Sequence, residues 1–393
     1  MWKDNSSSSD RAGTISRVHE CPESILFVNC DEPLFHEIEH PLETILETYR
    51  TEIYANPDAV QIFDEIQSIH GWESVIKSWY DCKTYTILLS GSSSALLNAN
   101  LSRLIAGRYL PVSVYPPDFA EFLSIKNIPV ETKPLKFSAK RFTYLQELKK
   151  YMETGGFPGV VKMTGVLETP EQTIGAELLA GYYHSIMYRD IEGNHPIRNP
   201  AALHELTEYL LANIAVPFSY QRLAKTFGLE AGTVKEYLSF AKEAFLMYEV
   251  RQFSYSLKTQ AAAQKKIYAA DTGMRNSVAF SFSRDEGRLV ENIVFLSFLS
   301  SGFEPYFWKR GGKGTEIDFV CKCRDSSLLL VNVSYTDDIN SRETKGFAAF
   351  QEAFGGSDTQ CLILMKNLEK TQEEITYIPV WKWLLTGSEK TGL

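Results

Sequence analysis

Two adjacent carboxylates, Asp64 and Glu65, directly follow a largely apolar run at residues 60–63. The run predicts a buried strand, so the two acids would stand at its carboxyl end. In a sheet that binds a nucleotide, the first carboxylate of such a pair holds the water shell of Mg²⁺, and the second activates the attacking water. A strand that ends in an acidic turn is common without this chemistry, so the pair needs supporting residues.

A group of small hydroxyl residues follows the next apolar run. Residues 85–89 end in Ser90, Gly91 and Ser92–Ser94. Serine hydroxyls at a strand tip beside the carboxylates would sense a γ-phosphate. The same residues also fit a plain strand-to-helix turn with a serine cap, and both interpretations stay open.

The elements that must position these side chains alternate between strand and helix. Strands alternating with helices favour a parallel, doubly wound sheet whose site lies at the carboxyl ends of the strands. The polar stretch 1–24 is predicted to be a disordered tail. We expect strands at 25–29, 60–64, 85–89 and 110–114, with helices at 42–49 and 70–80.

Short segments spread along the chain occur in the order found in one group of AAA-type P-loop ATPases. The chain resembles these prokaryotic proteins, whose ATPase core is fused to a C-terminal domain of uncharacterised function. The resemblance covers nearly the whole chain from Ile25. The segments that carry it are Phe63–Gln67, Gly91–Ser94, Leu104–Tyr109, Pro111, Phe119–Leu123, Gly155–Pro158, Tyr188–Ile191, Lys266–Tyr268, Asp271–Gly273, Glu291–Asn292, Glu316–Phe319 and Trp381–Leu384.

The resemblance implies roles for four residues. Asp64 would be the magnesium-associated carboxylate, Glu65 the catalytic base and Ser92 the sensor. Arg108 would be an arginine finger that reaches the γ-phosphate of a neighbouring subunit, although an ordinary surface ion pair fits it equally well. ATP and Mg²⁺ would be the cofactors, and the partners would include further copies of the chain.

The glycine-rich phosphate loop of that family has no counterpart here. Its sequence, G-x-x-x-x-G-K-[ST], supplies backbone N–H groups and a lysine that hold the phosphates. Before Ile25, Gly13 is followed by Thr14 without a lysine, and Gly311–Thr315 has the wrong spacing. We therefore expect either a truncated gene product or a domain that has become a scaffold, with ATP hydrolysis impaired or absent.

Composition sets broad limits. The 393 residues, 44% hydrophobic and 23% charged, fit two to four globular domains. No apolar run reaches the roughly 20 residues of a membrane span and no secretory signal follows Met1, so we expect a cytoplasmic protein that is not in the membrane. The six cysteines form no C-x-x-C pair, which favours reduced thiols over zinc or disulfides.

Charge limits the choice of partners. A net charge of −9 argues against a dedicated, tight nucleic-acid binder. Local basic patches are interpreted as solvated faces. They comprise Lys133, Lys136, Lys140, Arg141, Lys149 and Lys150, and then Lys258, Lys265 and Lys266.

A winged-helix pattern follows a mainly helical stretch at 134–199, which would form a lid and a connector. Its expected parts are a short helix from Phe218–Tyr220 through Ala224, a turn at 227–229, a helix at 231–245 and a wing at 247–255. The second helix carries Lys235 and Lys242 beside Glu236 and Glu243. Because these charges balance, we favour a packing or protein-contact role over DNA readout.

The order of elements from Arg288 to Val380 resembles the restriction-endonuclease-like fold. There, metal ions are held by a helix glutamate, a strand aspartate and an E-x-K pair on the next strand. Glu291 and Asp318 match the first two positions, but Asn332 and Ser334 occupy the third. The Asn332 amide oxygen would still be a ligand, whereas no residue replaces the lysine. A fold-stabilising network is the favoured interpretation, and we expect the nuclease to be silent.

Taken together, the chain is predicted to be an α/β multidomain protein with a partial P-loop parallel sheet. The predicted function is that of an AAA-type ATPase family member impaired in hydrolysis. The alternative is a non-catalytic DNA- or protein-binding module built on the winged helix and a degenerate nuclease fold. The expected domains are 1–24 (tail), 25–125 (partial ATPase core), 126–199 (helical lid and connector), 200–280 (winged helix) and 281–393 (restriction-endonuclease-like).

Overall fold

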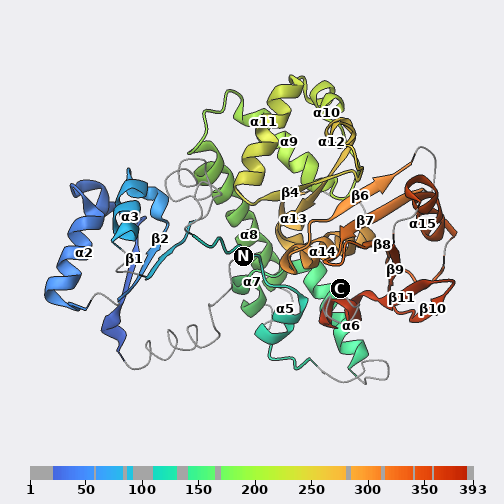
Figure 1. Cartoon of the computed structure of the whole chain (residues 1–393), viewed down its shortest axis with the longest axis horizontal. Coiled ribbons are helices and arrows are strands. Elements are labelled where there is room, and N and C mark those ends of the chain that lie inside the picture. Colours follow the sequence, from blue (N-terminus) through green and yellow to red (C-terminus); the bar gives the residue numbers. More distant parts are fainter. Residues whose placement is uncertain are drawn as a thin grey trace. The chain divides into compact units, whose positions relative to one another are not determined.

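Contacts divide the chain into two compact units, one up to Val112 and one from Ser113 (Figure 1). The computed structural model describes residues 21–56, 59–82, 86–91, 109–130, 140–163, 170–279, 285–310, 315–339, 341–355 and 358–386.

The first unit is built on a three-stranded parallel sheet in the order β1-β2-β3. Its strands are β1 (Ile25–Asn29), β2 (Val60–Asp64) and β3 (Thr86–Leu89), and its connections contain η1 (Pro22–Ser24), η2 (Pro33–Glu37), α2 (Pro41–Glu52), η3 (Ile66–Ser68) and α3 (Trp72–Asp81). The parallel sheet and both connecting helices expected from the sequence are confirmed. The β1–β2 register pairs Asn29 with Asp64, so both strands end at the same edge.

Among the described residues, the buried cluster of this unit lies on one face of the sheet. Phe63 is fully buried there, with Leu42 of α2 and Trp72 and Ile76 of α3 in the same cluster. On the other face Phe27 and Leu88 are 61% and 50% exposed. Parallel sheets are usually covered on both faces, so this unit differs from a complete doubly wound fold.

The strand expected at 110–114 is a wrong prediction. These residues are described, and they lie in no strand and pair with no described strand. Pro111 lacks the N–H that a ladder needs, which weakens pairing at the centre of the run. The apolar side chains Leu110, Val112 and Val114 are instead 79%, 77% and 91% exposed.

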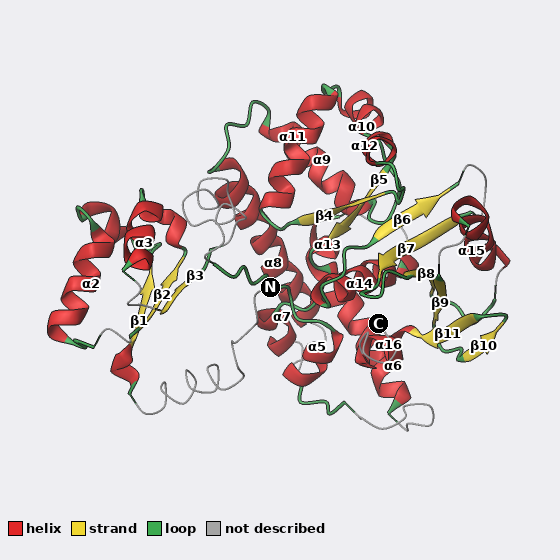
Figure 2. Cartoon of the chain, in the orientation of Figure 1, coloured by secondary structure: helices red, strands yellow, loops and turns green. Residues whose placement is uncertain are grey.

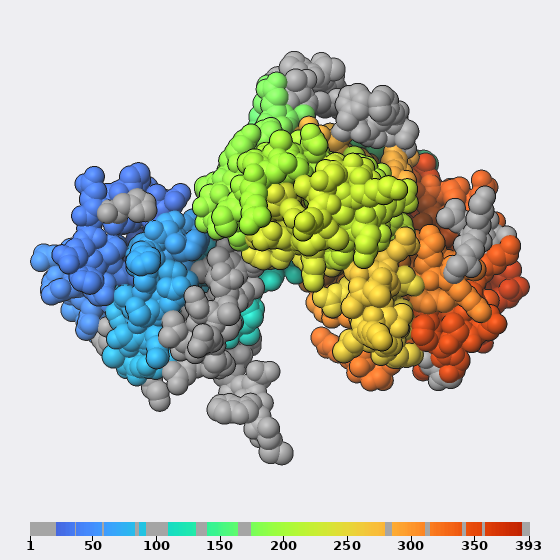
Figure 3. All heavy atoms as spheres, turned by 90° about the horizontal axis from the view of Figure 1, so that it is seen from above, coloured from blue at the N-terminus to red at the C-terminus, as the bar shows by residue number. Residues whose placement is uncertain are grey.

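The second unit begins with helices, as the sequence predicts for 134–199. Their bounds are α5 (Phe119–Ile125), α6 (Arg141–Thr154), α7 (Pro158–Met163), α8 (Pro170–Ser185) and the π-helix η6 (Ile186–Glu192). A three-helix group and a hairpin follow: α9 (Pro200–Ala212), α10 (Tyr220–Phe227), α11 (Ala231–Glu243), β4 (Met247–Arg251), α12 (Leu257–Ala262) and β5 (Lys265–Ala269). In Figure 3 the yellow-green atoms of this helical region form one continuous face.

A six-stranded mixed sheet completes the chain, in the order β10-β11-β9-β8-β7-β6 (Figure 2). We call it, with its helices, the C-terminal sheet domain. Apolar side chains of α14 pack on one face of the sheet and those of α15 on the other. Its elements are α14 (Glu286–Ser300), β6 (Tyr306–Lys309), β7 (Glu316–Lys322), β8 (Leu328–Ser334), α15 (Ser341–Phe354), β9 (Thr359–Met365), β10 (Lys370–Gln372), β11 (Ile375–Pro379) and α16 (Val380–Thr386).

The sequence predicts helices at 289–299 and 344–353 and strands at 304–308, 316–320, 328–334 and 360–365, and each of these elements is present. The β10–β11 pair was not expected. One hydrophobic core runs from Phe119 to Leu384, so the predicted lid, winged-helix and C-terminal ranges share a core. The domain boundaries within it stay predictions.

None of the helices in the described part of the chain combines the length and hydropathy that a bilayer crossing requires.

The short helix α13 (Thr272–Val278) joins several helices at the centre of this unit. Its Arg275 side chain is buried and donates to Leu211 O and Ala212 O, the last carbonyls of α9, at 3.0 and 3.1 Å. Asn276 donates to Met152 O at 3.0 Å near the end of α6. These bonds satisfy carbonyls that a helix end leaves without partners.

Asp271 caps α13 and also holds the neighbouring loop. Its carboxylate accepts the N–H groups of Met274 at 2.8 Å and Gly156 at 2.7 Å. A Cβ on Gly155 would lie 2.0 Å from the Asp271 carboxylate, so the loop needs glycine there. The segments Gly155–Pro158 and Asp271–Gly273, far apart in sequence, therefore form one junction.

Burial of Asp271 predicts a pH-dependent stability. Burial raises the pKa of this carboxyl from 3.8 to about 6, against three backbone N–H groups that lower it. The pKa of Asp271 in the folded state lies above its pKa in the unfolded state. The Asp271 carboxyl group therefore contributes fully to stability below about pH 4, and this contribution is lost as the pH rises through about 6. The loss amounts to about 3 kcal/mol in the free energy of unfolding.

Urea unfolding at stepped pH checks this expectation, with Asp271→Asn as the non-titrating reference. The stability difference between the parent and the variant should fall between about pH 4 and pH 6 and then stay level. A difference that does not change with pH would contradict it.

Candidate functional site

The carboxyl edge of the first sheet gathers polar side chains, as the sequence predicts. Ser90, just after β3, donates its hydroxyl to Asp64 Oδ1, and Gln67 donates its amide to Glu65 Oε2. Asp64 also lies next to the buried Cys30, whose thiol pKa rises to about 12 through burial and the nearby carboxylate. Both predicted carboxylates are therefore engaged by neutral donors from the sheet edge.

Glu65 has a backbone conformation that is rare for its residue type. Its φ is +52°, in the left-handed region, and it precedes η3. A non-glycine residue held there costs free energy and is enriched at functional sites. The strand ends at this turn, and the next residue still donates its N–H to Ser90 O at 3.2 Å. The other two residues predicted for this site, Ser92 and Arg108, lie outside the described residues.

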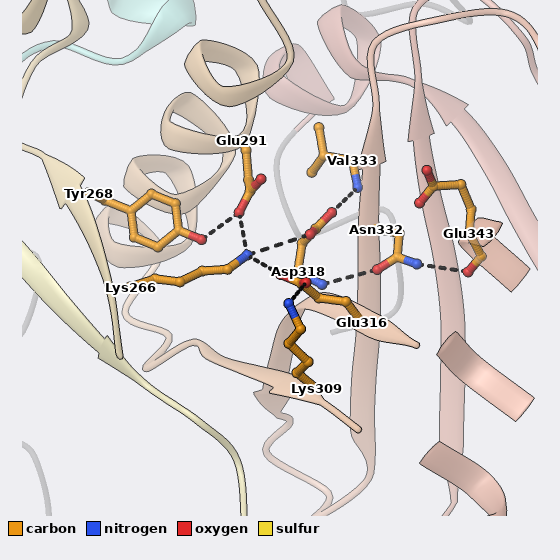
Figure 4. Close-up of polar contacts among 9 residues, drawn as sticks. All are labelled: Lys266, Tyr268, Glu291, Lys309, Glu316, Asp318, Asn332, Val333 and Glu343. Carbon is orange, nitrogen blue, oxygen red and sulfur yellow. Dashed lines mark hydrogen bonds and ion pairs between the residues drawn. The ribbon is translucent and has the colours of Figure 1, made fainter. Parts of the chain in front are cut away.

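A second constellation lies in the second unit, where β5, α14 and β7 meet (Figure 4). Lys266 extends from β5, and its side chain is 1% exposed. The Lys266 Nζ lies 2.9 Å from Glu291 Oε1, 2.9 Å from Glu316 Oε1 and 3.7 Å from Asp318 Oδ1. The carboxylates are 13–18% exposed, so the ammonium lies beneath them. We call these four residues the lysine–carboxylate cluster.

The positions of these residues along their strands explain why their side chains meet. Lys266 and Tyr268 are two apart in β5, so they share a face, and the Tyr268 hydroxyl donates to Glu291 Oε1 at 2.7 Å. Glu316 and Asp318 are likewise two apart in β7. Lys309 of β6 adds a second cation, 3.1 Å from Glu316 Oε2.

The protonation state of the cluster follows from burial and charge. Burial lowers the pKa of Lys266, but the attraction of Glu291, Asp318 and Glu316 is larger in sum, and its pKa is raised. Burial and the Glu291 charge raise the pKa of Asp318 well above its ordinary range, although Lys266 opposes them. With Lys309 included, two ammonium groups face three carboxylates, so a proton on Asp318 would leave these five side chains neutral together.

Asn332 does not face the cluster as a ligand. Its Oδ1 accepts the Asp318 N–H at 3.0 Å, and its Nδ2 donates to Glu343 O at 2.8 Å (Figure 4). Both ends of the amide are used by backbone, so Asn332 ties β7 to β8 and to the first turn of α15. The Asp318 carboxylate is also bonded to β8, because its Oδ2 accepts the Val333 N–H at 2.9 Å.

The structure brings Glu291 and Asp318 together, as predicted, and adds two residues. Glu316 was detectable from sequence, because it stands two positions before Asp318 in the same strand. Lys266 was not, because it comes from another part of the fold. The interpretation of Lys265 and Lys266 as a solvated basic face is wrong, because both side chains are buried. Lys265 donates to Ala261 O at 2.7 Å, and Lys266 lies in the lysine–carboxylate cluster.

The described residues offer no grouping of three or more His, Cys, Asp or Glu side chains arranged to hold a metal ion. All six cysteines are free, and Cys321 and Cys323 are both buried. The cation nearest the carboxylates of the second constellation is Lys266 itself.

Three family models match separate parts of the chain. Residues 12–123 match an AAA domain, residues 145–285 a domain of unknown function (DUF8612) and residues 286–383 a domain of unknown function (DUF4143). A region similar to an AAA domain therefore precedes a C-terminal region similar to DUF4143, in the order that the resemblance implies.

Relatives share most of this length. An uncharacterised protein of Methanocaldococcus jannaschii is 29% identical over 340 residues, which cover 82% of this chain and 74% of the relative. An uncharacterised protein of Haemophilus influenzae is 27% identical over 330 residues, which cover 82% of this chain and 77% of the relative. Among solved structures, the Walker-type ATPase of Pyrococcus abyssi matches with a TM-score of 0.41 and 11% identity, over 68% of this chain and 87% of that one.

Proposed function

We propose that this chain is an AAA-type ATPase family protein in which the magnesium-binding strand is retained and ATP hydrolysis is impaired or absent. One observation carries the proposal. Asp64 and Glu65 stand at the carboxyl edge of a parallel sheet, within a region that matches an AAA domain, in a sequence that contains no G-x-x-x-x-G-K-[ST].

The consequence for nucleotide binding follows from what each part supplies. Backbone N–H groups and the lysine of the phosphate loop provide most of the attraction for the phosphates. Asp64 would contact only the water shell of a Mg²⁺ that the phosphates themselves bring. Without the loop, this carboxylate alone gives little affinity, and Glu65 has no positioned water to activate.

Calorimetric titration of the full chain with Mg-ATP tests the proposal. We expect dissociation constants no tighter than about 1 mM, equivalent to at most about 4 kcal/mol, because the phosphates lack their main partners. Asp64→Ala should behave like the parent, and so should Glu47→Ala, a control for removal of an exposed carboxylate on α2.

Micromolar binding that disappears in Asp64→Ala and persists in Glu47→Ala would overturn the proposal. It would mean that other residues hold the phosphates. Micromolar binding that both variants retain would also contradict it, because the nucleotide would then occupy a site elsewhere in the chain.

A second candidate is a non-catalytic binding module, and the arrangement of α9–α11 and β4–β5 supports it. Two consecutive helices are followed by an antiparallel hairpin, and Phe218 forms an isolated β-bridge to Lys265 beside it, an order typical of winged helices. On α11, Lys235 is exposed beside Glu236, and Lys242 Nζ lies 3.8 Å from Glu249.

This charge balance favours a protein partner over DNA, because groove-reading helices carry a positive surplus. Salt-dependent retention of the same preparations on immobilised DNA would favour DNA instead.

A further inference from the structure

The C-terminal sheet domain has the order of elements that supports a restriction-endonuclease-like fold. Helix α14 carries Glu291, β7 carries Asp318, and β8 pairs antiparallel with β7 and parallel with β9. In such folds the carboxylates hold a divalent metal ion that positions the attacking water. Whether a metal ion fits here is decided by the atoms around these carboxylates.

The oxygen atoms that a metal ion would need already bind an ammonium group. Lys266 Nζ approaches Glu291 and Glu316 at 2.9 Å each, and Asp318 at 3.7 Å, from the buried side of the cluster (Figure 4). Mg²⁺ requires oxygen ligands at about 2.0–2.1 Å in near-octahedral geometry. A divalent ion at the same oxygens would face the positive charge of Lys266 at close range.

Lys266 has no alternative position of low energy. Its side chain is 1% exposed, and its Nζ lies 5.4 Å from the centre of the Phe307 ring. Moving the ammonium away from the carboxylates would leave a buried charge without a partner, which costs several kcal/mol. The lysine is therefore held in place more firmly than an exchangeable ion.

Lys266 also cannot replace the missing catalytic lysine. A catalytic lysine polarises a water molecule, whereas the Lys266 ammonium is directed to carboxylates. The positions that carry the E-x-K pair in that fold hold Asn332 and Ser334, and both ends of the Asn332 amide are bonded to backbone.

We propose that the Lys266 ammonium is the resident cation of the lysine–carboxylate cluster, in the position that a divalent metal ion takes in restriction-endonuclease-like enzymes. The cluster then holds β5, α14 and β7 together by charge, and it does not bind metal. The C-terminal sheet domain accordingly acts in binding or assembly and does not cleave nucleic acid. This inference is independent of whether the AAA region binds ATP.

The experiment measures Mn²⁺ binding by electron paramagnetic resonance and calorimetry, with no reliance on activity. All variants carry Asp64→Ala, so that the first sheet contributes no magnesium-type site. The parent chain should show no Mn²⁺ binding that depends on Asp318. Lys266→Met leaves the carboxylates without their cation, so Mn²⁺ affinity should rise at least about tenfold, and adding Asp318→Asn should abolish the gain.

Lys309→Met is the matched control. It also removes an ammonium that pairs with Glu316, but this side chain is 38% exposed and lies at the edge of the cluster. It should leave Mn²⁺ binding as in the parent, because Lys266 stays in place.

Two results would overturn the proposal. One is Mn²⁺ binding by the parent chain that Asp318→Asn removes, because the cluster would then hold metal with Lys266 present. The other is a folded Lys266→Met chain that gains no Mn²⁺ binding. If Lys266→Met does not fold, the comparison between the parent and Asp318→Asn decides alone.

Discussion

Replacing Lys266 with methionine is expected to lower the free energy of unfolding by about 3–5 kcal/mol, because it leaves three carboxylates that are only 13–18% exposed without the buried ammonium. Methionine nearly preserves the length and volume of the side chain, so the loss reports on charge more than on packing. Urea unfolding of the full chain, followed by circular dichroism, measures it. Lys309→Met should cost no more than about 1 kcal/mol, since that ion pair is partly exposed.

A compensating substitution separates charge from shape. Glu291→Gln in the Lys266→Met background removes one of the unpaired carboxylates and retains a polar partner for the Tyr268 hydroxyl. The double variant should be more stable than Lys266→Met alone. If Lys266→Met is as stable as the parent, or if Glu291→Gln adds to the damage, the cluster is not held by the Lys266 charge.

Gly273→Ala is expected to cost about 3 kcal/mol or more in the second unit, because a new Cβ would collide with backbone. The Cβ would lie 2.1 Å from Thr154 O and 2.7 Å from Gly155 N. Neither atom can rotate away as a side chain would, and the same junction holds the Asp271 bonds to Gly156. The closely packed ends of α6 and α13 would therefore have to separate.

Gly232→Ala is the matched control, because this glycine lies in α11 with no atom within 4 Å of a new Cβ. Alanine favours a helix over glycine by about 1 kcal/mol, so this variant should be as stable as the parent or more so. Thermal unfolding of both variants checks the pair. Equal melting temperatures for Gly273→Ala and the parent would show that the junction is adaptable.

Much of the fold was predictable where one segment carried its own signal. Short apolar runs were sufficient for β2 and β8, alternating residues for β7, and longer helical stretches for α2 and α11. The prediction failed at 110–114, because an apolar run forms a strand only when another strand supplies hydrogen bonds, and pairing is not a property of the run. It also did not foresee β10 and β11, which are short and half-exposed.

The same distinction applies to the candidate sites: pairs within one segment were visible in the sequence, and contacts between distant segments were not. Asp64 and Glu65 are adjacent in sequence, and Glu316 and Asp318 share one strand face, so the carboxylate pairs were visible without a structure. Asp271 and Gly156 are 115 residues apart, and only the folded chain brings that carboxylate to that N–H group.

Sequence by itself determined that carboxylates would stand at the carboxyl edge of a parallel sheet and on β7 of a second sheet. It also determined the region that matches an AAA domain. Only the tertiary structure decided what those carboxylates bind. In the sequence, Lys266 resembles a surface lysine because it lies in a basic run. In the structure it is buried, because β5 pairs with β4 and passes beside α14. A buried charge must find its partners wherever the fold places them, and no local pattern records that choice.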